Sequence, residues 1–173
     1  RDTCAQLLET AGLPADDARL AADVLVASDL RGVETHGVSN LMRSYITGLG
    51  NGHLNPRPDM RIVRETPACA TIDSDGGMGV VIAPKAMEIA IEKGKATGAG
   101  LVSIANGRHL GMAGYHAMMA LEHDMIGQCM TACGPTFAPT FAAEAAIGTN
   151  PIAIAAPAGE EPPFVFDAAM SIL

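Results

Sequence analysis

The fold class is decided by the segment from Cys69 to Ala105, which reads CATIDSDGGMGVVIAPKAMEIAIEKGKATGAGLVSIA. It begins with a strand-like run, Cys69–Asp73, and ends with a run typical of a buried strand, Leu101–Ala105. Between them we expect a helix that Pro84 opens and that continues to Thr97, with apolar positions at helical spacing. A strand, a helix and a second strand in this order are typical of α/β proteins, in which helices cover a sheet.

The α/β pattern continues on both sides of this segment. One strand is expected before it, and a helix, a strand, a long irregular stretch and two more strands after it: Arg61–Glu65, Met112–His123, Ile126–Ala132, Cys133–Asn150, Ile152–Ala156 and Phe164–Asp167. We therefore expect a mixed-sheet α/β domain over residues 53–173, which holds the substrate and cofactor sites. Because no further element completes the α/β pattern after the last expected strand, we expect this domain to be incomplete at its C-terminus.

The residues before this domain predict helices. A short helix is expected from Asp2 or Thr3 to Ala11, and a second from Pro14 to Gly32. A third helix is expected to begin at a Thr35 cap, because apolar residues then recur at intervals of three and four. These helices predict an N-terminal helical segment over residues 1–52, packed as one layer.

Charge and composition exclude several classes of function. The net charge is −8, and an acidic surface repels nucleic-acid phosphates and anionic membranes, so neither partner is expected. No apolar stretch approaches the roughly 20 residues that a transmembrane helix needs. The four cysteines lack the spacing of a metal site, which favours reduced thiols in a cytoplasmic protein.

Thr35-His36-Gly37 is the first candidate for chemistry. A helix start offers free N–H groups and a positive dipole end, which suit a carboxylate ligand. A histidine there could exchange a proton with a substrate oxygen near neutral pH. The alternative is that His36 only serves the cap of the helix.

The loop Asn106-Gly107-Arg108-His109-Leu110-Gly111 is the second candidate, and it follows the strand that ends at Ala105. Open α/β sheets bind ligands at the carboxyl ends of strands, so His109 is placed to approach a substrate. Arg108 would hold a carboxylate or face solvent. A histidine with a purely structural role in the loop is the alternative interpretation.

Gly148-Thr149-Asn150-Pro151 is the third candidate, because a tight turn with exposed backbone donors suits phosphate or ribose. Gly77–Ile82 begins like a dinucleotide fingerprint but lacks its third glycine and the acidic residue that should follow, which argues against a Rossmann loop. His109, His116 and His123 recur every seven residues. Such spacing along a helix is too wide for one metal ion, so no metal site is expected.

In their order and spacing, these motifs resemble the malate/L-lactate dehydrogenase family of the non-Rossmann type. This family includes ureidoglycolate, sulfolactate and diketogulonate enzymes and a cyclic-imine reductase. The resemblance is carried by Asp29–Gly32, Thr35–Val38, Asn106–Gly111, Gly148–Ala153 and Phe166-Asp167. It implies the family's own α/β fold, a non-Rossmann nicotinamide site for NAD or NADP, and a homodimer of longer chains.

The resemblance also implies roles for single residues. His36 or His109 would donate and accept the proton of the carbinol oxygen, and both stay candidates. The cofactor would be bound by Cys133, Gly148, Thr149, Asn150, Asp167, Ala168 and Ala169. Substrate would contact the start of the third helix and the loop of the second motif, through Thr35, Asn40, Arg43 and Arg108.

Several positions depart from the pattern of the family. Thr35 replaces the usual serine before the first histidine but keeps its hydroxyl. Asn40 stands where an arginine usually clamps the substrate carboxylate, so Arg43 or Arg108 is expected to substitute. Cys133 replaces a serine-like cofactor contact, and Phe141–Ala143 replaces a Trp-Gly-Gly stretch. The departures leave open which substrate is used.

We therefore expect an oxidoreductase that transfers a hydride between NAD(P) and a small 2-hydroxy acid and its 2-oxo acid, malate-like or lactate-like. A cyclic imino-acid reductase is the alternative enzyme, because it also anchors a carboxylate but needs no strong acid at an oxygen. A non-catalytic α/β binding module or fragment is the third hypothesis. An α/β pattern that continues beyond Leu173 favours an enzyme, whereas a chain that stops there favours the module.

Overall fold

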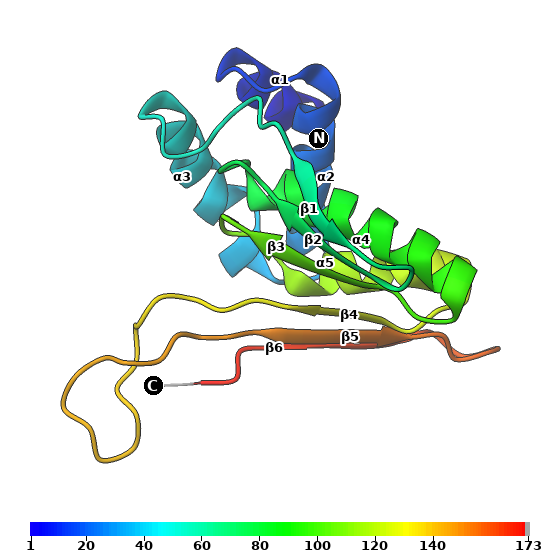
Figure 1. Cartoon of the computed structure of the whole chain (residues 1–173). Coiled ribbons are helices and arrows are strands. Elements are labelled where there is room, and N and C mark those ends of the chain that lie inside the picture. The colour runs from blue at the N-terminus through cyan, green and yellow to red at the C-terminus, as the bar shows by residue number, and fades with distance from the viewer. Residues whose placement is uncertain (172–173) are drawn as a thin grey trace. The chain divides into compact units, whose positions relative to one another are not determined.

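The computed structural model describes residues 1–171 and has the α/β architecture that the sequence predicts (Figure 1). The chain divides into two compact units, the first ending at Met112 and the second beginning at Ala113. Within the described residues, the strands form two three-stranded sheets, one in each unit, where a single mixed sheet was expected. The division predicted at residue 52, between helical segment and α/β domain, stays a prediction.

The first unit begins with the expected helices. They are α1 (Asp2–Thr10), α2 (Ala15–Leu30), the 3₁₀ turn η1 (Glu34–His36) and α3 (Val38–Gly50). Pro14 is the N-cap of α2, and two aspartates occupy the first turn of this helix, as predicted. The apolar faces of α1, α2 and α3 meet in a core that includes Leu8, Val24 and Leu25, all fully buried.

The start of α3 differs from the prediction. Thr35 does not cap the helix, because residues 34–36 form the turn η1 and α3 begins only at Val38. The carboxylate of Asp29, at the end of α2, accepts a hydrogen bond from the Val38 backbone N–H at 3.0 Å. This carboxylate caps the helix from outside its own segment, which local sequence alone does not reveal.

The first sheet has the order β1-β2-β3, with β1 (Arg61–Glu65), β2 (Cys69–Asp73) and β3 (Leu101–Ala105) at the predicted positions. β1 pairs antiparallel with β2, and β2 pairs parallel with β3, so this sheet is mixed. The helix α4 (Gly79–Thr97) makes the crossover and lies along the sheet (Figure 1). Ile72 of β2 packs against Ile82 and Ala86 of α4 in the core between them.

The start of α4 also corrects a prediction. Pro84 does not open the helix but lies inside it, since α4 begins at Gly79. A proline there removes one backbone hydrogen bond of the helix. The first turns, Gly79–Pro84, are all buried, so tertiary packing offsets this loss.

The second unit contains an antiparallel sheet in the order β4-β5-β6, formed by β4 (Gly127–Met130), β5 (Ile152–Ala156) and β6 (Phe164–Ala168). The helix expected over Met112–His123 is divided into α5 (Ala113–Met118) and a 3₁₀ turn, η2 (Met119–His123). Small residues let α5 lie close to the sheet. A side chain at Gly127 would place its Cβ 2.0 Å from the Ala117 carbonyl oxygen.

The stretch between β4 and β5 is irregular, as predicted, and β4 is shorter than the strand expected over Ile126–Ala132. A single bridge, Phe137 to Ile147, closes the long loop on itself. None of the helices within residues 1–171 combines the length and apolar character needed to cross a bilayer.

Candidate functional site

The loop Asn106–Gly111 leaves the carboxyl end of β3 and is held against the start of α4. Asn106 adopts φ 55°, a left-handed conformation that asparagine tolerates better than most residues. A Cβ at Gly79 would lie 2.2 Å from the Arg108 carbonyl oxygen and 2.4 Å from that of His109. The glycine at the first position of α4 therefore permits the close approach that positions His109.

The ring of His109 is held through its Nδ1 atom. The Gly111 backbone N–H donates to Nδ1 at 3.2 Å, and the Tyr45 hydroxyl lies 3.1 Å from the same atom. The Tyr45 hydroxyl is also 3.4 Å from the His109 carbonyl oxygen. Partial burial of the ring lowers the pKa of His109 below its usual 6.5, and the neighbouring His36 lowers this pKa further.

His36 stacks on His109, with ring centroids 5.4 Å apart and planes inclined by 20°. Its Nδ1 lies 2.9 Å from the Thr35 hydroxyl. The structure thus brings together the histidines of two motifs that are far apart in the sequence. Two imidazoles and a hydroxyl at one point can bind an oxyanion and exchange a proton with it.

The polar residues predicted to bind substrate have different surroundings. Asn40 donates from its side chain to the Glu34 carbonyl oxygen at 2.8 Å, which fastens η1 to α3. Arg108 donates to the carbonyl oxygens of His53, Asn106 and Gly107, so it braces its own loop. Arg43 is exposed on α3, three positions after Asn40. The substrate contacts of these residues stay predictions.

Four of the predicted cofactor-binding residues come together in the second unit. The Cys133 backbone N–H donates to Oδ1 of Asn150 at 3.0 Å, and the Thr149 hydroxyl donates to Sγ of Cys133 at 3.2 Å. A Cβ at Gly148 would lie 2.4 Å from the Cys133 carbonyl oxygen. The turn 148–150 is therefore packed directly against Cys133.

The remaining three predicted cofactor residues lie at the end of β6. Asp167 accepts a hydrogen bond from the Gly114 backbone N–H at 2.7 Å, which caps the start of α5. Ala168 ends β6, and Ala169 follows it. The Met170 backbone N–H then donates to the Thr149 carbonyl oxygen at 2.8 Å, which brings this segment to the turn 148–150.

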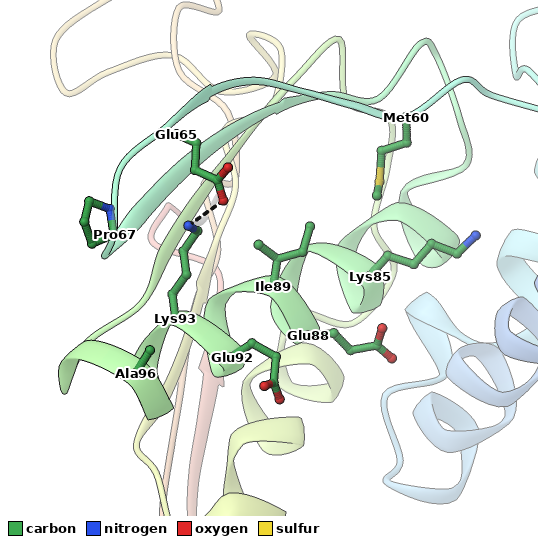
Figure 2. Close-up of a pocket in the computed structure, with 9 residues that line it drawn as sticks. All are labelled: Met60, Glu65, Pro67, Lys85, Glu88, Ile89, Glu92, Lys93 and Ala96. Carbon is green, nitrogen blue, oxygen red and sulfur yellow. Dashed lines mark hydrogen bonds and ion pairs between the residues drawn. The ribbon is translucent and has the colours of Figure 1, made fainter.

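The described residues contain no group of three or more His, Cys, Asp or Glu side chains that could hold a metal ion. One open groove lies between the β1–β2 hairpin and α4 (Figure 2), and none of the predicted site residues lines it. Its lysines are engaged within the protein. Lys93 donates to Glu65 at 2.8 Å and to the Thr66 carbonyl oxygen, and Lys85 donates to Asp17 at 2.6 Å.

Two residues that organise the histidine pair were not singled out from the sequence. Tyr45 lies at one of the regularly spaced apolar positions of the third helix, and only its hydroxyl indicates a buried polar partner. Asp29 belongs to a motif that carried the family resemblance, but without an assigned role. A Cβ at Gly37 would lie 1.6 Å from Oδ1 of Asp29, which explains why glycine follows His36.

Comparison with known proteins gives a consistent result. The sequence profile described as malate/L-lactate dehydrogenase matches residues 1–173. A malate dehydrogenase from Pyrococcus abyssi is 46% identical over 168 residues, covering 97% of this chain and 46% of that protein. An L-sulfolactate dehydrogenase from Methanocaldococcus jannaschii is 47% identical over 149 residues, covering 86% of this chain and 43% of that protein.

A solved structure agrees with the sequence comparisons. The malate dehydrogenase of Pyrococcus horikoshii OT3 superposes with a TM-score of 0.95 at 45% identity, over 98% of this chain and 48% of that one. The chain thus spans about half the length of the curated relatives that it matches.

Proposed function

Because the chain belongs to the malate/L-lactate dehydrogenase family, we propose that the protein interconverts a 2-hydroxy acid and its 2-oxo acid with a nicotinamide cofactor. In the oxidation direction, C2 of the hydroxy acid loses a hydride and its hydroxyl oxygen loses a proton, and a C=O bond forms. The cofactor, when bound, takes up or supplies the hydride. A residue of this chain must take up or supply the proton.

The observation that carries the proposal is the stacked pair His36–His109. The two rings lie 5.4 Å apart, although their motifs are separated by most of the first unit. His36 lies beside the Thr35 hydroxyl, and His109 belongs to the loop Asn106–Gly111. A carbinol oxygen bound next to the two rings therefore contacts a group that can exchange a proton. A structural role for each histidine alone would not require the pair to meet.

The residues around the turn 148–150 fit a nicotinamide nucleotide. The hydroxyl of Thr149 and the exposed thiol of Cys133 lie next to each other, and Gly148 packs directly against the Cys133 backbone. Hydroxyl and backbone groups of this kind bind ribose and phosphate oxygens. Cys133 and the turn 148–150 would hold the cofactor, together with the segment 167–169.

The names of the relatives suggest a substrate class. Malate and sulfolactate are both 2-hydroxy acids with a second anionic group on C3. Arg43 follows Asn40 by three positions within α3, a spacing that places these two side chains on one face of the helix. Arg43 would bind one anionic group of a malate-like substrate, since Asn40 is uncharged.

The test is oxidation of NADH and of NADPH by the full-length protein, followed by absorbance, with oxaloacetate, sulfopyruvate, pyruvate and a cyclic imino acid. We expect turnover with the dianionic 2-oxo acids and a loss of about 100-fold or more in His36→Ala. Faster turnover of the cyclic imine, with little effect of this variant, would replace the proposal by an imine reductase. Binding of NADH without any turnover would favour a non-catalytic module.

The preferred cofactor, the assembly and the location complete the proposal. The same assay compares NAD with NADP. The homodimer rests on the family resemblance and the cytoplasmic location on the spacing of the cysteines, and light scattering of the full-length protein measures the assembly.

A further inference from the structure

The Nδ1 atom of His109 has one fixed hydrogen-bond donor and one hydroxyl within reach. The Gly111 backbone N–H donates to it at 3.2 Å, and the Tyr45 hydroxyl lies 3.1 Å away. A backbone N–H can only donate, so its hydrogen bond requires a lone pair on Nδ1. The ring proton of neutral His109 is then on Nε2.

We propose that Tyr45 and Gly111 hold His109 in the Nε2–H form, so that His109 donates a hydrogen bond to the substrate and His36 alone exchanges the proton. This inference rests on the proposed hydride transfer and deepens it, because it assigns different roles to two histidines that sequence reasoning leaves equivalent. Tyr45 is a positioning residue, since it acts through His109.

His109 is poorly suited to proton exchange. As a base it would need a lone pair facing the substrate, but its lone pair faces Gly111 and Tyr45. As an acid it would have to be an imidazolium, and a proton on Nδ1 would break the hydrogen bond from Gly111. Partial burial and the adjacent His36 also lower its pKa and so oppose the charged form. A neutral imidazole can still polarise a carbonyl through its Nε2–H.

His36 has the opposite setting. The partner of its Nδ1 is the Thr35 hydroxyl at 2.9 Å, and a hydroxyl both donates and accepts. When Nε2 of His36 takes the hydroxyl proton of a 2-hydroxy acid, Nδ1–H donates to Thr35. When this proton returns to the oxygen of the 2-oxo acid, the hydroxyl can rotate and donate to Nδ1. The pair Thr35–His36 thus accommodates both protonation states without losing its hydrogen bond.

Tyr45 is built to stay a donor. Tyr45 is only 4% exposed, on the buried face of α3. Its hydroxyl has one proton, which the His109 carbonyl oxygen at 3.4 Å and Nδ1 of the ring at 3.1 Å can share, because both are acceptors when Gly111 donates to Nδ1. Burial raises the pKa of Tyr45 far above its ordinary value, so the hydroxyl keeps its proton. A Tyr45→Phe substitution retains the packing of the ring and removes only this donor.

The first test is NMR of the chain, which does not depend on activity. Long-range ¹H–¹⁵N correlations of the imidazoles distinguish the two neutral forms. We expect His109 to show the Nε2–H pattern above neutral pH and to gain Nδ1–H population in Tyr45→Phe. The pattern of His36 should stay unchanged in the same variant, which makes it the internal control. An Nδ1–H pattern for His109 in the unmodified chain overturns the inference.

The second test compares glutamine at both positions in the full-length protein. A glutamine amide can donate a hydrogen bond but cannot exchange a proton at neutral pH. We expect His109→Gln to keep turnover within about 100-fold of the parent and to retain its pH profile, and His36→Gln to lose about 100- to 10,000-fold. The reverse order overturns the inference. If no 2-oxo acid is turned over at all, the proposed function fails, and the NMR result still decides the form of His109.

Discussion

Oδ2 of Asp29 lies 3.0 Å from the backbone nitrogen of Val38, and this contact fixes where α3 begins. The last turn of α2 thereby holds the segment that carries His36. Gly37 completes the arrangement, because Oδ1 of Asp29 occupies the space where a side chain at this position would lie. The histidine is thus placed by a contact between two helices.

The first prediction follows from this contact. Asp29→Ala removes the cap of α3 and should lower the free energy of unfolding by about 1 kcal/mol, as measured by urea denaturation. Asp29→Asn keeps an acceptor and should cost less. Gly37→Ala should destabilise the parent by more than it destabilises Asp29→Ala, because the clash requires the carboxylate. Equal costs of Gly37→Ala in both backgrounds would show that the two residues are not coupled.

The second prediction concerns the close approach of α4 to the loop Asn106–Gly111. Gly79→Ala would place its Cβ 2.2 Å from the Arg108 carbonyl oxygen and should destabilise the protein by about 1–3 kcal/mol. Gly50→Ala is the matched control, since Gly50 is helical and its Cβ would meet nothing within 4 Å. This control should be neutral or stabilising by up to about 1 kcal/mol. Similar effects of both substitutions in urea denaturation would contradict the role of Gly79.

The sequence predicts those elements whose positions are determined by neighbouring residues. The strands Arg61–Glu65, Cys69–Asp73 and Leu101–Ala105 are found at their predicted positions, because alternation and turn residues define them over a few residues. The starts of α3 and α4 were wrong for a shared reason. One depends on the Asp29 carboxylate and the other on the burial of the first turns, Gly79–Pro84, and neither is encoded locally.

The candidate site shows the same division. The motifs single out both histidines as candidates, because each lies at the boundary of an element with a glycine nearby, although this spacing alone leaves a structural role open for each. Tyr45 was hidden among apolar helix positions, since its partner, His109, is 64 residues away in the sequence. Only the folded chain shows that the hydroxyl of a core tyrosine reaches the histidine ring.

The third prediction is a pH dependence. The folded pKa of His109 lies below its unfolded value of about 6.5, so the unfolded chain binds the proton more readily. The contribution of His109 to stability is therefore complete above that pH and is lost as the pH falls from about 6.5 through the folded pKa. As the pH is lowered over this range, the free energy of unfolding measured by urea denaturation should fall less in His109→Gln than in the parent. An identical loss in both would contradict the lowered pKa.

The fourth prediction separates the two causes of that pKa. His36→Asn removes the neighbouring charge, so the pKa of His109 should rise. The pKa of His109 should nevertheless stay below about 6.5, because burial, the larger of the two causes, is unchanged in this variant. An NMR titration of the His109 Cε1–H signal measures this directly. A pKa that falls in His36→Asn would mean that the stacked ring stabilises the charged form.

The last prediction concerns two cysteines of the second unit. Burial, and then the charge of Asp167, raise the pKa of Cys129 to about 12, whereas Cys133 is exposed. Near pH 8 only about one Cys129 in ten thousand is a thiolate, so iodoacetamide should modify Cys133 long before Cys129. Exposed Cys69 serves as the reactive reference, read by mass spectrometry.

Two further arms make the alkylation experiment decisive. Asp167→Asn keeps an acceptor for the Gly114 N–H but removes the charge, so the reaction of Cys129 should become faster. In the full-length protein, NADH should slow the modification of Cys133 without changing that of Cys69, because Cys133 would lie against the bound nucleotide. Equal rates for Cys133 with and without saturating NADH would remove this cysteine, and the turn packed on it, from the cofactor site.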